Sequence, residues 1–180
     1  MSKDEKKNIE SSQEEQKIDV KPTAYKVPPV IGLESVIGAA TVLAMRSQSH
    51  KHLFAGDFEW LIIPPIALKQ FRLFRQKKQN APVAFVSWAS VSEDVEKRLL
   101  QGSMKLAPKD WNSGDKLWLI DVISPFTSNK EILKQLSESE FKDKDINVLR
   151  PMKGKKGFEG KSLLEALKED VVDSGEKNQN

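Results

Sequence analysis

The sequence predicts a mixed α/β (α+β) fold, a single layered domain whose sheet is flanked by helices. Three observations support this prediction. Two apolar segments on either side of a polar turn have the pattern of a β-hairpin, later strand-like segments alternate with helix-like ones, and 180 residues suit one domain.

The first expected element is a helix. Apolar residues recur at helical spacing from Leu33 to Ala44, which predicts an amphipathic helix that ends near Ser47. The apolar run Trp60–Ile66 contains Pro64-Pro65, so it is either the end of a strand or the point where a helix stops.

A hairpin and a second helix follow. The segments Gln70–Arg75 and Pro82–Ala89 flank a polar turn, which predicts a β-hairpin. Ser90 with Glu93 matches a capping box, in which the two side chains bind the first N–H groups of a helix. The apolar stripe of that helix is Val95, Leu99 and Leu100.

The second half of the chain alternates strands with helices. Lys116–Ile123 and Ile146–Leu149 are apolar and rich in β-branched residues, which predicts two strands. Two further serines, each with a glutamate three residues later, predict helix starts; these pairs are Ser128 with Glu131 and Ser162 with Glu165.

The two ends of the chain differ from the rest. The first 26 residues hold six basic and six acidic side chains and few apolar ones, so they bury too little surface to offset the entropy of ordering. We expect disordered tails over residues 1–26 and 168–180 and a domain over residues 27–167. That domain holds 21 basic and 16 acidic residues, an excess too mild to imply nucleic acid.

The basic excess gathers in two clusters. Each is either a solubilising surface or a docking face for an acidic macromolecule. The first consists of Lys69, Arg72, Arg75, Lys77 and Lys78, and the second of Lys153, Lys155, Lys156 and Lys161. Glycines accompany the second cluster but do not open a helix directly behind a strand, so we expect a mobile basic loop there.

Composition excludes several kinds of chemistry. The chain has no cysteine, which excludes disulfides, cysteine zinc ligands and cysteine nucleophiles. With His50 and His52 as the only histidines, we expect no metal site. The sequence has no signal-peptide apolar region and no run of roughly 18 apolar residues, so we expect a cytoplasmic protein without a transmembrane segment.

Asp121 is an acid within an apolar strand. Period-two alternation would put its side chain on the face of Leu117, Leu119 and Ile123. A carboxylate among apolar neighbours loses hydration and needs a hydrogen-bonding partner. Asp121 is therefore either a structural buried carboxylate or part of a functional site.

His50 and His52 follow the first predicted helix. Two solvated loop histidines are the plain interpretation of such a pair. A neutral imidazole can also act as a general base, and the junction of a helix with an apolar segment suits the lip of a cleft.

Several segments in a fixed order together resemble a known family. They are Ser47-x-x-His50, Trp60–Ile66 with its Pro-Pro-Ile ending, the hairpin strand with VSWAS, and WNSGDKLWLIDVISPF from Trp111 to Phe126. This order and separation resemble the toxin-activating lysine acyltransferases of the RTX (hemolysin-activating) family, over roughly residues 33–150.

The resemblance implies a GNAT-like fold and a cytoplasmic activity. Members move a fatty acyl group from acyl carrier protein to internal lysines of an RTX protoxin, without a tightly bound cofactor. The resemblance assigns the essential pair to His50 and Asp121 and matches Ser47 to a serine near the histidine. This chain departs from the family where Lys51-His52 follows His50, and where Leu61 replaces an asparagine of some members.

The implied chemistry suits the residues present. A lysine amine has an unperturbed pKa near 10.4, so less than about 1% is nucleophilic at neutral pH. Aminolysis of a thioester therefore needs a base, for which His50 is the candidate, and donors for the oxyanion. Asp121 would orient the imidazole or the incoming ammonium, and the basic cluster that begins at Lys69 would dock the acidic carrier protein.

Two other functions stay open on the sequence alone. One is a GNAT-like acetyltransferase that uses acetyl-CoA, and the other is a non-enzymatic adaptor whose basic surface binds an acidic partner. A homodimer is also left open.

Overall fold

Within residues 32–152 and 157–168, which the computed structural model describes, five strands form one mixed sheet in the order β1-β2-β3-β4-β5. Neighbouring strands are antiparallel except for the parallel pair β3 and β4. The strands are β1 (Phe71–Arg75), β2 (Pro82–Val91), β3 (Lys116–Ile123), β4 (Asn147–Pro151) and β5 (Phe158–Ser162). The helices are α1 (Leu33–Arg46), α2 (Phe58–Leu61), α3 (Ile63–Ala67), α4 (Glu93–Leu100) and α5 (Asn129–Ser139), with single 3₁₀ turns at Ala55–Asp57 and Pro108–Asp110.

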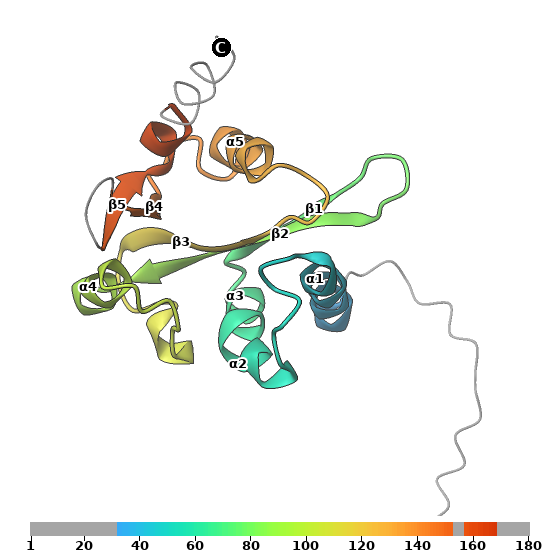
Figure 1. The fold of residues 1–180 in the computed structure, drawn as a ribbon, viewed down its shortest axis with the longest axis horizontal. Coiled ribbons are helices and arrows are strands. Elements are labelled where there is room, and N and C mark those ends of the chain that lie inside the picture. Colours follow the sequence, from blue (N-terminus) through green and yellow to red (C-terminus); the bar gives the residue numbers. More distant parts are fainter. Residues whose placement is uncertain (1–31, 153–156, 169–180) are drawn as a thin grey trace, which may run out of the picture. The chain divides into compact units, whose positions relative to one another are not determined.

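Helices cover both faces of this sheet (Figure 1). On one face α1, α2 and α3 pack against Phe85 and Ile123 of the two central strands. On the other face α5 packs through Ile132 and Leu136 against the apolar side chains of β2, β3 and β4. The predicted mixed α/β sheet with flanking helices is therefore confirmed.

The apolar segment after α1 is helical. Its two short helices, α2 and α3, meet at Ile62, and Pro64 and Pro65 lie in the first turn of α3. Proline is tolerated there because the first N–H groups of a helix have no partner within the helix. The alternative of a strand end is wrong.

The predicted hairpin is confirmed, but the cap predicted after it is wrong. Strand β2 continues to Val91, so Ser90 lies in the sheet opposite Leu117. The residue that caps α4 is Ser92, whose Oγ accepts a hydrogen bond from the N–H of Val95. Ser90 instead uses its backbone to bind the loop before β3, where its carbonyl accepts from Ser113.

The remaining helix predictions hold in position. Ser128 is the N-cap residue of α5, although its side chain makes no capping hydrogen bond. Residues 163–168 are helical and begin directly after Ser162, as predicted.

Strand β5 was not predicted. It pairs antiparallel with β4 where the sequence suggested a mobile basic loop, so that expectation is wrong for residues 158–162. Gly160 is required because a Cβ there would lie 2.5 Å from the Trp118 ring. Of the second basic cluster, Lys161 lies on β5 beside Glu159.

Several expectations fall outside the described residues. These are the tail over residues 1–26, the segment after residue 168, and Lys153, Lys155 and Lys156. The predicted tail and domain boundaries therefore stay predictions.

A β-bulge in the sheet changes the predicted environment of Asp121. Ser87 of β2 faces Asp121, but the next residue, Trp88, faces Leu119, so Ile120 is an extra residue on β3. Such a bulge reverses the alternation of side chains. Leu117 and Leu119 consequently pack on the α5 face, and Asp121 shares the α1 face with Ile123 but not with the two leucines. The predicted face is wrong for those two neighbours.

Gly114 provides a test of the loop that leads into β3. A Cβ at this position would lie 2.5 Å from the Val91 carbonyl oxygen and 2.7 Å from the Ser92 Cα atom, both of them backbone. We expect Gly114→Ala to lower the free energy of unfolding by about 1–3 kcal/mol, as overpacking does. Denaturant unfolding followed by circular dichroism measures this change.

The matched control is Gly38→Ala on the exposed side of α1, where a Cβ has no neighbour within 4 Å. Helix propensity should make that variant more stable by up to about 1 kcal/mol. Equal stabilities of the two variants would contradict the tight contact at Gly114.

Candidate active site

His50 is held by a tight turn at the end of α1. The N–H of Ser47 donates to the carbonyls of Leu43 and Ala44 and so closes the helix. The Ser47 carbonyl then accepts from the N–H groups of His50, at 3.2 Å, and Lys51, at 2.9 Å. Because Leu43 and Ala44 are buried in the core, the backbone of the turn that carries the His50 imidazole is held in place.

The turn brings His50 onto Asp121 of β3. His50 Nε2 lies 3.0 Å from Asp121 Oδ1, and the two side chains are 13% and 16% exposed. The same carboxylate oxygen accepts from the N–H of Val122 at 2.8 Å. The sequence thus identified two residues that share one partly exposed site, although their roles remain predictions.

Two hydroxyl groups lie on the other nitrogen of the ring. Ser47 Oγ is 2.7 Å and Ser49 Oγ 3.0 Å from His50 Nδ1, and the two hydroxyls are 3.2 Å apart. Ser47 is buried, at 7% exposure, whereas Ser49 is exposed. Ser47 was predicted from the sequence and Ser49 was not, although the Ser-x-Ser-His spacing was an available signal.

Apolar side chains are exposed around this turn. Met45 precedes it, Phe54 follows it, and both are largely exposed. Phe126, in the loop after β3, is also exposed and lies beneath the guanidinium of Arg46, 6.0 Å from its ring centroid. His50 and Asp121, which we call the dyad, therefore have exposed apolar residues close to them in the sequence.

Asp57 fixes the segment that leaves the turn. Its carboxylate accepts from the N–H of Phe54 at 2.9 Å and from Trp60 Nε1 at 3.1 Å. These two hydrogen bonds, first that from Phe54 and then that from Trp60, hold the pKa of Asp57 below its usual value. The carboxylate thus ties Phe54 to α2.

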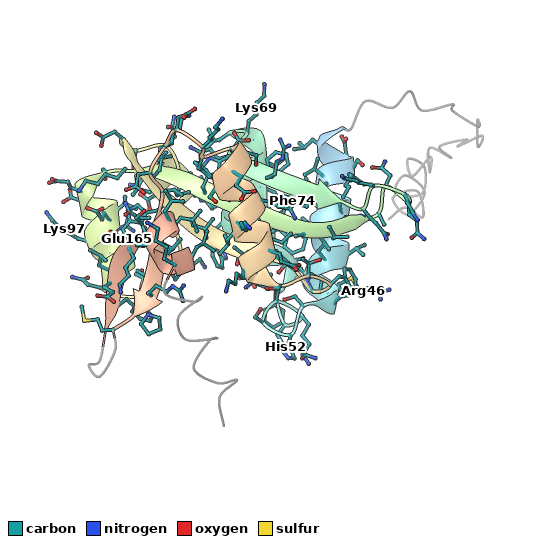
Figure 2. The ribbon with its side chains drawn as sticks, turned by 90° about the horizontal axis from the view of Figure 1, so that it is seen from above. Arg46, His52, Lys69, Phe74, Lys97 and Glu165 are labelled. Carbon is teal, nitrogen blue, oxygen red and sulfur yellow. The ribbon has the colours of Figure 1, made fainter. Side chains whose placement is uncertain are left out.

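The other predicted site residues are spread more widely. Four cations of the first basic cluster lie on β1 or the hairpin turn, where Arg72 is 3.9 Å from Glu140 and Arg75 donates to the Asn80 carbonyl. Figure 2 shows Lys69 on the opposite side of the described unit from His52.

The two positions at which the chain departs from the family differ in exposure. His52 is exposed, and Leu61 is buried in the core beneath α1.

Comparison with known proteins identifies the family. The model of the RTX toxin acyltransferase family matches residues 32–159, a range that includes both the His50 turn and Asp121. The chain belongs to this family.

Three named relatives of the chain are lysine acyltransferases. It is 29% identical to a lysine-acyltransferase of Vibrio cholerae, over 61% of this chain and 71% of that protein. It is 32% identical to a protein-lysine myristoyltransferase of Escherichia coli, over 64% of each chain. It is 31% identical to a leukotoxin-activating lysine-acyltransferase of a Pasteurella haemolytica-like species, over 58% of this chain and 62% of that protein. The matched region is thus less than two thirds of the last two relatives.

The described part of this RTX acyltransferase-family chain has neither a metal-binding cluster nor a membrane-spanning helix. Residues 32–152 and 157–168 contain no group of three or more histidine and acidic side chains placed to hold a metal ion. No described helix is long and apolar enough to cross a membrane.

Ser87 lies beside the dyad and tests how the site is built. It is fully buried on β2 directly opposite Asp121, and neither its Oγ nor Asp121 Oδ2 has a hydrogen-bond partner among the described residues. An unpaired buried hydroxyl costs stability, so Ser87→Ala should raise the free energy of unfolding by up to about 1 kcal/mol. Thermal unfolding measures this difference.

The control is Ser113→Ala, which removes a hydroxyl that donates to the Asp110 carbonyl and accepts from the N–H of Ser92. That variant should lose about 1 kcal/mol. A loss of similar size at Ser87 would show that its hydroxyl is hydrogen-bonded in solution.

Proposed function

We propose that this protein transfers a fatty acyl group from acyl carrier protein to internal lysines of an RTX-type protoxin and so activates it. The observation that carries the proposal is the 3.0 Å contact between His50 Nε2 and Asp121 Oδ1, at a partly exposed position within the region matched by the family. Fold and family alone would not assign a reaction, because one fold hosts many activities.

The proposed reaction is direct aminolysis of a thioester. The lysine amine attacks the acyl carbonyl, and His50 accepts the proton that the amine must lose. The thiolate of the carrier leaves and takes a proton from the imidazolium. This route needs no covalent enzyme intermediate.

Asp121 and Ser47 are positioning residues in this proposal. Asp121 holds the Nε2 side of the ring and stabilises the imidazolium that forms, as a buried carboxylate beside a catalytic histidine does. Ser47, buried and 2.7 Å from Nδ1, fixes the rotation of the ring from the other side.

The open side of β3 supports binding of an extended substrate there. Among the described residues, β3 and β4 are joined through a single residue pair, Trp118 with Asn147, so β3 has no strand partner on that side where it reaches Asp121. Unpaired strand backbone can form hydrogen bonds with an extended chain. The exposed Met45, Phe54 and Phe126 supply apolar surface suited to an acyl chain.

The basic cluster of the hairpin supports docking of an acidic carrier protein. Arg72, Lys77 and Lys78 are exposed, so they can act through long-range attraction. Lys69 and Arg75 complete this proposed docking surface, with Lys69 at its far end from the His50 turn.

Variants of the dyad test the proposal. His50→Ala and Asp121→Ala should each reduce acyl transfer by at least about 10³-fold while the protein stays folded, because base catalysis and its support are lost together. His52→Ala, which changes an exposed neighbour, should keep most of the activity. Purified enzyme, acyl carrier protein and protoxin are mixed, and acylated lysines are mapped by mass spectrometry.

An inactive His52→Ala with an active His50→Ala would reverse the assignment. No acylation by the wild type with every substrate present would contradict the proposed function. Partner binding that survives loss of both dyad residues, with no transfer, would favour an adaptor.

The acyl donor is tested by calorimetry. We expect acyl carrier protein to bind and Lys77→Glu with Lys78→Glu to weaken that binding by about tenfold at low salt, since electrostatic attraction is screened by ions. The matched charge change Lys142→Glu with Lys144→Glu, which lies outside the hairpin, should have a smaller effect. Micromolar binding of CoA without the carrier would favour the acetyltransferase alternative.

A further inference from the structure

We propose that Ser49 is a catalytic residue, the hydroxyl that passes the proton of the attacking lysine amine to His50 Nδ1. The inference rests on the proposed function, which requires a base but does not say how the proton reaches it. It follows from which nitrogen of His50 can accept a proton and from which hydroxyl group can deliver one to that nitrogen.

The contacts of the ring determine which nitrogen can accept a proton. An ionised carboxylate only accepts hydrogen bonds, so the 3.0 Å contact with Asp121 Oδ1 places the hydrogen of the neutral imidazole on Nε2. The lone pair is then on Nδ1. Ser47 and Ser49 both lie on that side of the ring, at 2.7 and 3.0 Å.

Exposure separates the two serines. Ser47 is buried at the end of α1, so a lysine of another protein cannot contact its hydroxyl without displacing the turn. Ser49 is exposed, and its Oγ is within hydrogen-bond distance of both Nδ1 and Ser47 Oγ. Ser49 is therefore the hydroxyl through which an external amine reaches the base.

The step balances without a further reactant. As the amine nitrogen bonds to the acyl carbon, its N–H proton moves to Ser49 Oγ, and the hydroxyl proton of Ser49 moves to His50 Nδ1. When the carbon–sulfur bond breaks, the thiolate recovers a proton from the imidazolium. Ser49 ends as it began, and no bond forms between the acyl group and the enzyme.

Substitution of Ser49 tests the relay. Ser49→Ala should lower kcat for acyl transfer by about 10²-fold, the lower end of general acid–base effects, with KM for the acyl carrier protein unchanged. Ser49→Thr keeps a hydroxyl and should retain at least about a third of wild-type kcat. In the wild type kcat should fall in D₂O with a proton inventory that requires two protons in flight, and Ser49→Ala should need only one.

A control in the same turn separates the relay from a general disturbance of the turn. Gln48→Ala changes the exposed neighbour of Ser49 and should leave kcat and KM unchanged. Wild-type kcat in Ser49→Ala, or an acyl group trapped on Ser47 by rapid quenching, would overturn the relay and leave the proposed function standing. A wild-type protein that transfers no acyl group would refute the proposed function, and the relay with it.

Discussion

The hydrogen bond between His50 and Asp121 joins parts of the chain that are 71 residues apart, and the site depends on it. Each partner is fixed by the same core. Leu43 and Ala44, which close α1 just before the histidine, pack in one cluster with Phe85 of β2 and Ile123 of β3. A substitution in that core would therefore change the distance between the imidazole and the carboxylate, although both side chains would still be present.

The bulge in β3 determines which way the carboxylate faces. If β3 were a regular strand without the bulge, alternation would put the Asp121 side chain on the same face as Leu119, which packs against the α5 layer. With it, Ile120 packs in the cluster beneath α4 while Asp121 meets the turn after α1. Bulges next to functional residues often redirect a side chain in this way. The interruption of the ladder thus accompanies a carboxylate that faces the turn carrying His50.

Much of this arrangement could be predicted from local patterns, because α1, the hairpin and β3 have strong periodicity. The cap at Ser90 was wrong because strand pairing with Leu117 overrides a local capping signal. Strand β5 was missed because Phe158–Ser162 has no apolar alternation; it forms through pairing with β4 and through the space that Gly160 leaves for Trp118. The bulge depends on the register between two strands, and no single-strand pattern specifies register. Ser49 was missed for a related reason, since its position on Nδ1 depends on the turn and on Asp121 holding the opposite nitrogen.

The two ring nitrogens of His50 have different partners, a carboxylate on Nε2 and hydroxyl groups on Nδ1. In the proposed mechanism Asp121 is ionised and accepts from Nε2, so the ring accepts a proton through Nδ1, where hydroxyl groups lie. A serine bound to a histidine that is itself bound to an aspartate has the composition of a nucleophilic triad. Here, however, the serine nearest the ring is buried, and a thioester carbonyl would have to enter the end of α1 to reach it. This arrangement supports the proposed route, in which an amine that approaches from outside is deprotonated and no acyl-enzyme forms.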